Sequence, residues 1–288
     1  MIAVSDILIV SLKQTLFTLL YIGLIWTVVL ATEPFLLPRV TLAKGALANH
    51  QLMRGLPIEI LLVAQRTFLV GRVNLWQWAL IGLLTLQIQL VLFAEWFARE
   101  MPSTILVFLL IYLGTLVVVA LREHYDCAHN GILANNVRMG TAVFAIIWIS
   151  FAAMMWSGRN HIHEMSSHIL PAVRSPALAL ILANCLVLTP FFTFVEKPSR
   201  ASKLDEFIIF LSQVAWFTWL GALFVGNLSL TGLGEPLIRA LQVVTAILLV
   251  RFGYYFLPQL RADSLTRKLL WVNIPLFIVS CLSIFWRA

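Results

Sequence analysis

The stretch that decides the fold is Thr15–Leu37, which reads TLFTLLYIGLIWTVVLATEPFLL and holds a single charged residue, Glu33. A helix needs about 20 mostly apolar residues to cross the hydrocarbon core of a bilayer. This stretch is long enough, so it predicts a transmembrane helix. Seven further apolar runs predict seven more, at 76–97, 104–121, 140–157, 176–195, 207–230, 237–257 and 269–286.

The composition of the whole chain agrees with this pattern. Of its 288 residues, 61% are hydrophobic and 11% are charged, and the mean hydropathy is +0.93. A soluble domain carries about 25% charged residues, and this chain has too few polar residues to cover a soluble surface. A soluble globular protein and a disordered chain are therefore excluded. We expect an all-α integral membrane protein, with residues 1–288 forming one polytopic domain of eight transmembrane helices.

The connection after the first apolar run predicts one further helix. Within it, Ile58–Val70 alternates an apolar face with Glu59, Gln65 and Arg66. This pattern is typical of an amphipathic helix that lies in the membrane interface.

The positive charges predict how the chain is oriented. The formal net charge is +7, and 13 of the 20 Lys and Arg residues fall in the odd-numbered connections between the runs. Cytoplasmic loops of membrane proteins carry an excess of Lys and Arg. We therefore expect a multi-pass protein of the cytoplasmic (inner) membrane, with both termini outside and the odd connections in the cytoplasm.

Charged residues at or inside the apolar runs are the candidates for function, because each costs about 2.5–3.5 kcal/mol at the centre of a membrane helix on the insertion scale. Glu33 closes the first run, and Glu95 lies near the outer end of the second. Arg239 and Arg251 lie near the ends of the seventh. A mixed-charge loop spans 196–206, and Asp126 lies in a polar loop after the third run.

Metal and nucleophile chemistry find no support in the sequence. The cysteines Cys127, Cys185 and Cys281 are not clustered, and the His, Asp and Cys spacing in the connection Arg122–Met139 fits no recognised zinc pattern. No nucleotide loop or Ser/His/Asp arrangement is present, so we predict no catalytic residue and no metal site. The four aspartates do not pair at the spacing that a prenyl-transfer enzyme uses to hold magnesium diphosphate.

The C-terminal third carries a resemblance to a known family. Arg251, Pro258, Arg261 and Asp263, followed by Trp271 and Pro275, resemble the end of the heel subunit of respiratory complex I, the NADH-quinone oxidoreductase. The step Thr189-Pro190-Phe191 before a charged loop resembles a second part of that family. The resemblance covers roughly residues 120–288, and before that it is one of architecture only.

The departures from that family point to a divergent member. Phe192 stands where the family has an Asp, and Lys197, Arg200 and Lys203 dilute the acidic loop. The family's quinone-side motifs are not recognisable after the first run, which argues against a complete quinone tunnel. The short chain is more similar to the counterpart subunit of membrane-bound, energy-converting nickel–iron hydrogenases.

The resemblance implies a non-catalytic membrane subunit of a redox complex. It would anchor a peripheral electron-transfer module and couple that module to proton or sodium translocation. The ion-transfer or coupling candidates are Glu33, Asp126, Glu196, Asp205 and Glu206. The cations expected to dock the peripheral module are Arg39, Arg54, Arg66, Arg72, Lys197, Arg200, Lys203, Arg267 and Lys268.

The expected partners are hydrogenase-like or dehydrogenase-like iron–sulfur subunits on the cytoplasmic side, antiporter-like membrane subunits and the lipid bilayer, but no nucleic acid. Iron–sulfur clusters, and possible nickel–iron, would belong to the partners, because this chain lacks clustered cysteines. Two alternatives stay open. A stand-alone secondary transporter predicts a polar site at mid-membrane. The amides Gln87, Gln89, Asn184, Gln213 and Asn273 lie within the apolar runs, but scattered amides of this kind more often form interhelical hydrogen bonds. A lipid or prenyl-transfer enzyme is the other.

Overall fold

The computed structural model describes residues 4–36, 75–125, 161–162, 203–222 and 234–256, together with residues 275, 278, 279 and 282. The bounded elements in this part of the chain are all α-helices. They are α1 (Val4–Leu36), α4 (Leu75–Leu92), α5 (Ala94–Glu100), α6 (Thr104–Tyr125), α11 (Lys203–Leu220) and α12 (Gly234–Phe256). The helical class predicted from the sequence is therefore confirmed for this part, whereas the predicted runs at 140–157 and 176–195 and the amphipathic segment at 58–70 lie outside it.

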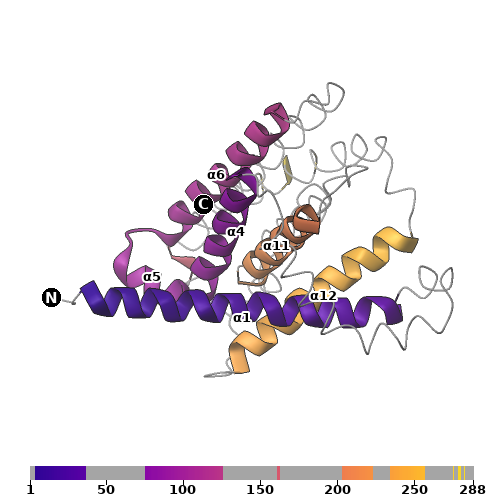
Figure 1. The fold of residues 1–288 in the computed structure, drawn as a ribbon, viewed down its shortest axis with the longest axis horizontal. Helices are drawn as coiled ribbons and strands as arrows, with labels where there is room; N and C mark the ends of the chain where they lie inside the picture. The colour runs from indigo at the N-terminus through magenta and orange to yellow at the C-terminus, as the bar shows by residue number, and fades with distance from the viewer. Residues whose placement is uncertain are drawn as a thin grey trace.

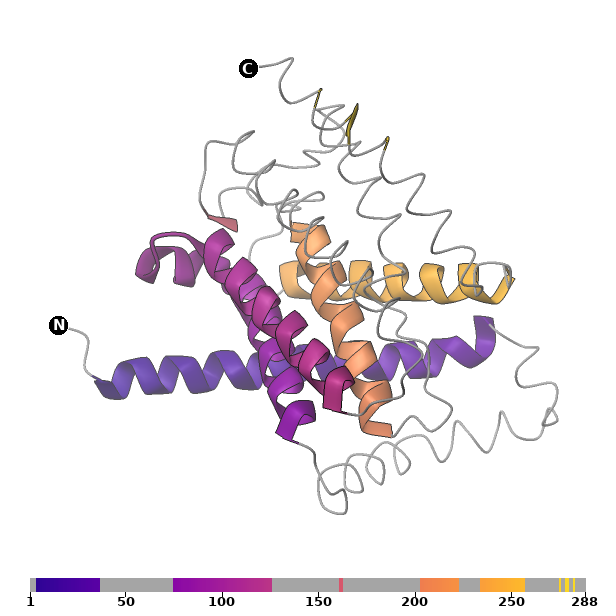
Figure 2. The same ribbon diagram turned by 90° about the horizontal axis from the view of Figure 1, so that it is seen from above.

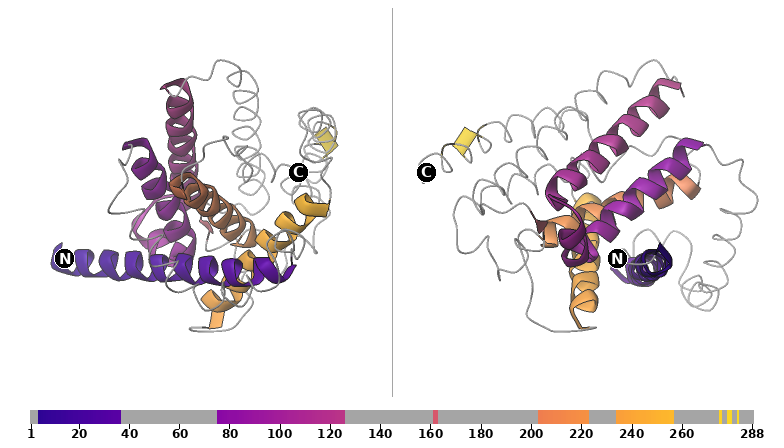
Figure 3. Two further views of the ribbon diagram at one scale, coloured as in Figure 1. Left: turned by 45° about the vertical axis from the view of Figure 1, so that its right-hand side comes forward. Right: turned by 90° about the vertical axis from the view of Figure 1, so that its left-hand side faces the viewer.

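Helices α4 and α6 form an antiparallel pair, and α11 packs beside α4 (Figures 1 and 2). The long helix α1 crosses this group, which is clearest in the right-hand view of Figure 3, where α1 is seen end-on. It also packs against α12, which in turn contacts α11. The described helices therefore meet around α11.

Helix α11 is the core of the bundle. Every side chain from Gln213 to Leu220 is buried, including the large rings of Trp216 and Trp219. A helix that is buried on all sides must be covered by neighbours on all sides. By contrast, α1 exposes a row of leucines at Leu8, Leu12, Leu16, Leu19, Leu20 and Leu24.

Within the described ranges, two helices are long and apolar enough to cross a membrane. They are Leu8–Thr32 within α1 and the whole of α4, and the bent pair α5–α6 would make a third. Exposed leucine side chains such as those on α1 are favourable against lipid chains and unfavourable in water. Helices of this length and apolarity are typical of an integral membrane protein.

The first helix begins earlier than predicted. The sequence suggested a start at residue 15, whereas α1 starts at Val4 and the apolar window includes Lys13. Residues 7–12 are almost all apolar, and a single lysine does not interrupt a helix because its helix propensity is high.

The second predicted run, 76–97, is not one straight helix. It breaks at Phe93, where φ is −112° and ψ is 32°, so the run becomes α4 followed by the short α5. No Pro or Gly marks this break in the sequence. Helix α5 ends at Glu100 because Met101 is extended before Pro102, as residues before proline prefer.

The other helix starts have clear local causes. Ser103 caps α6, since its Oγ accepts a hydrogen bond from the Leu106 N–H at 3.3 Å. Pro236 lies in the first turn of α12, where its missing N–H costs nothing. The predicted helices at 104–121, 207–230 and 237–257 correspond to α6, α11 and α12, with starts within four residues of those predicted.

Candidate functional site

One face of α1 carries polar groups into the bundle interior. Gln14, Thr18 and Tyr21 are 6%, 0% and 4% exposed, and their spacing puts them on one stripe with Ile25 and Val29. The Thr18 hydroxyl donates to the Gln14 carbonyl at 2.8 Å, so its oxygen keeps lone pairs that can accept from elsewhere. The buried stripe of α1 is thus polar in its first half and apolar in its second.

Three helices meet at Tyr21. The Tyr21 hydroxyl lies 3.5 Å from Oγ1 of Thr218 on α11, and either oxygen can be the donor. Helix α12, which carries Arg239, packs against both α1 and α11. We name the region around the Tyr21–Thr218 contact, where these three helices pack together, the Tyr21 junction.

A second polar contact joins α4 and α6. The Gln87 side-chain amide donates to Thr115 Oγ1 at 2.8 Å, and Thr115 donates in turn to the Ile111 carbonyl at 2.9 Å. Gln87 is 2% exposed and Thr115 6%. The interhelical hydrogen bond considered for Gln87 is confirmed. Gln89 and Gln213 are also buried, whereas Asn184 and Asn273 lie outside the described residues.

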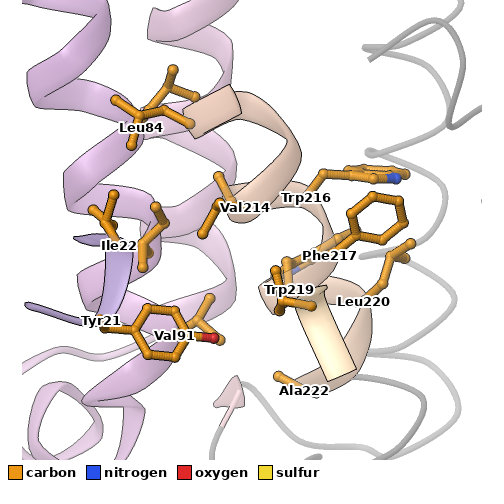
Figure 4. Close-up of a cluster of buried hydrophobic side chains, with 14 of the residues drawn as sticks. Tyr21, Ile22, Leu84, Val91, Val214, Trp216, Phe217, Trp219, Leu220 and Ala222 are labelled. Carbon is orange, nitrogen blue, oxygen red and sulfur yellow. The ribbon is translucent and has the colours of Figure 1, made fainter. Parts of the chain in front are cut away.

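Apolar side chains surround these polar contacts on both sides of α11. In Figure 4, Val214 points toward Ile22 of α1 and Leu84 of α4, whereas Trp216 and Phe217 lie on the other side of α11. Phe108 of α6 stacks on Trp219 with ring centroids 5.1 Å apart and an interplanar angle of 4°. This packing excludes water around the described polar groups and strengthens their electrostatic interactions.

Three of the predicted ion-transfer residues lie on helix ends that face the same side of the bundle. Trp26, two turns before Glu33 on α1, packs edge-on against Phe207 and Phe210 of α11 at centroid distances of 5.4 and 4.5 Å. Asp205 and Glu206 directly precede Phe207 in the first turn of α11. The end of α1 that carries Glu33 therefore lies toward the start of α11 that carries Asp205 and Glu206.

The other predicted residues divide between helix ends and undescribed parts of the chain. Lys203 opens α11, Arg251 is in the last two turns of α12, and α6 ends at Tyr125, one residue before Asp126. The remaining candidates lie outside the described residues; these are Asp126, Glu196, Pro258, Arg261, Asp263, Arg39, Arg54, Arg66, Arg72, Lys197, Arg200, Arg267 and Lys268.

Glu95 lies at the opposite end of the bundle from Glu33. It forms an ion pair with Arg99 at 3.0 Å, with side chains 63% and 74% exposed. The Glu95 side chain is therefore outside the interior of the described helices. Within the described ranges, no three His, Cys, Asp or Glu residues are gathered as a metal site would need.

Sequence reasoning missed the Tyr21 junction. Its signal was present, because Gln14, Thr18 and Tyr21 recur at helical spacing within an apolar run. A search of the sequence for charged residues within the apolar runs does not identify these neutral side chains. Comparison of the chain with protein-family models, with curated proteins and with solved structures finds no match.

Proposed function

We propose that this chain is the membrane-anchor and ion-coupling subunit of a complex I-like or energy-converting hydrogenase-type redox complex. It links a peripheral electron-transfer module to proton or sodium translocation across the cytoplasmic membrane, with both termini outside. The peripheral iron–sulfur subunits carry the redox cofactors, and this chain carries none. The resemblance of residues 251–275 to the complex I heel family supports the identity of the complex.

The observation that carries the coupling role is the placement of the carboxylate residues. Glu33, Asp205 and Glu206 come from helix ends on one side of the bundle, where Trp26 packs on Phe207. Intramembrane carboxylates are expensive unless they serve ion transfer or are paired. Tyr21 lies earlier on α1 than Glu33. The Tyr21 junction therefore supplies hydrogen-bonding groups between the Glu33 end of α1 and the end of the bundle that carries α5.

Purification in mild detergent tests the assembly. We expect the chain to co-purify with a stoichiometric assembly that contains iron–sulfur clusters, and nickel if the module is a hydrogenase. A stable monomer or homodimer that is active alone would refute the proposal.

Substitutions in the purified complex test the coupling role. Glu33→Gln and Glu196→Gln should lower ion movement per electron transferred in vesicles while leaving assembly intact. Glu95→Gln is the matched control, because it also removes one carboxylate but at an exposed position. Equal coupling in Glu33→Gln, Glu196→Gln and wild type would remove both residues from the ion route.

The Tyr21 junction has its own test within the same complex. Tyr21→Phe deletes the hydroxyl and keeps the ring that packs in the core, and we expect it to reduce coupled ion movement. Tyr112→Phe is the control, since Tyr112 is another buried tyrosine at 8% exposure, on α6. If both variants behave alike, the Tyr21 hydroxyl has no specific role.

A stand-alone secondary transporter is the second candidate. The observation that favours it is the burial of the Gln213 amide near the middle of α11, since transporters place polar groups at mid-membrane. It predicts solute uptake by the purified chain alone in proteoliposomes, which the redox-complex proposal does not.

A further inference from the structure

Helix α5 is a seven-residue helix between two long ones, and it meets α6 at an angle of 105°. Such a bend has three explanations in a membrane protein. The segment could be a broken span, a re-entrant loop buried in the membrane, or a helix lying on the membrane surface. The side chains of α5 distinguish among them.

One face of α5 is packed and the other is charged. Ala94 and Phe97 are buried at 6% and 7% exposure, whereas Glu95, Arg99 and Glu100 are exposed. Exposed charges are very unfavourable among acyl chains but favourable among headgroups. An amphipathic helix of this kind has the composition of the membrane interface.

The tryptophan on α5 also indicates a position at the membrane interface. Trp96 is half-buried and packs edge-on against Phe97 with centroids 4.9 Å apart. Tryptophan is enriched where headgroups meet acyl chains. At the far end of α4, Trp76 and Trp78 supply two more tryptophans. The 18 residues of α4 extend about 27 Å. This length is close to the thickness of the hydrocarbon core of a bilayer, about 30 Å.

The ends of other helices lie close to α5, at the same end of the bundle. Thr104 at the start of α6 accepts a hydrogen bond from the Ile162 N–H at 2.8 Å. The end of α11 contacts the start of α6 through Trp219 and Phe108. Phe17 of α1 packs edge-on against Phe93 with centroids 5.7 Å apart. The α5 end of the bundle is therefore a layer where helices α4 and α11 end and α6 begins.

We propose that α5 lies flat in the phospholipid headgroup layer and marks one surface of the membrane. This proposal stands independently of the redox function.

Spin-label depth measurements in phospholipid vesicles test the proposal on the full chain, with Cys127, Cys185 and Cys281 replaced by Ser. Labels at Glu100→Cys on α5 and Leu110→Cys on α6 both start from exposed positions. We expect the label at 100 to be accessible to a water-soluble nickel chelate and the label at 110 to oxygen dissolved in the acyl chains.

Each result decides the placement. Equal oxygen accessibility at 100 and 110 would show a re-entrant segment and overturn the proposal. Chelate accessibility at both positions would place α6 outside the bilayer and overturn it equally.

Bromolipid quenching of tryptophan fluorescence gives a second measurement that keeps the native cysteines. The Trp96→Phe variant should lose a component that lipids brominated near the headgroup quench more than lipids brominated near the chain ends. Trp219→Phe is the matched control, since Trp219 is 2% exposed and should be quenched by neither lipid. Stronger quenching of the Trp96 component by deep bromines would overturn the proposal.

Discussion

The hydrogen bond between Gln87 and Thr115 offers a sharp energetic test of the α4–α6 pair. In Thr115→Val the buried Gln87 amide loses its acceptor at 2.8 Å. An unsatisfied buried donor costs about 1–3 kcal/mol. Gln87→Leu removes the amide itself, and Thr115 keeps its bond to the Ile111 carbonyl. We therefore expect Thr115→Val to destabilise the protein more than Gln87→Leu does.

The double variant reveals the contribution of the pair. With both partners apolar, no donor of this pair remains unsatisfied, so the double variant should be more stable than the sum of the two single changes predicts. Interhelical hydrogen bonds in a membrane average about 0.6 kcal/mol and reach about 1.7, and we expect a coupling energy in that range. The assay is reversible unfolding in bicelles. Additive effects of the two substitutions would refute the contact.

Three further substitutions test other described contacts, each by the free energy of unfolding in the same assay. Trp219→Ala should cost about 3 kcal/mol, because it removes a buried ring that stacks on Phe108; a loss under half of that would contradict the packing. Ser103→Ala should cost about 1 kcal/mol through the lost cap of α6, and Ser103→Thr should restore most of it. Glu95→Gln should change stability by well under 1 kcal/mol, since its ion pair with Arg99 is exposed; a large loss would show that this pair is buried in the folded protein.

The sequence predicted the helices of the described part well because long apolar runs have few alternatives in a bilayer. The starts of α6, α11 and α12 were close to those expected. The break at Phe93 could not be predicted, since neither Pro nor Gly stands there and the bend depends on how α5 packs through Ala94 and Phe97. The start of α1 was misplaced because the lone Lys13 resembles a boundary, although the helix continues through it.

The candidate site was predicted less completely. Glu33, Asp205 and Glu206 were identified by their charge, but their common side follows from the contact of Trp26 with Phe207 and Phe210, which no spacing reveals. The Tyr21 junction depends on three helices far apart in the sequence. Hydropathy marks which residues enter the membrane, whereas the partners of Tyr21 depend on how helices pack.

The contact between Tyr21 and Thr218 joins residues that are 197 apart in the chain. At about 5–20 residues per second, synthesis reaches Thr218 roughly 10–40 s after Tyr21. During that interval the Tyr21 hydroxyl lacks its Thr218 partner, although α1 is already long enough to insert. Helix α12 is made later still and packs against both α1 and α11, so the described bundle is complete only once α12 has emerged.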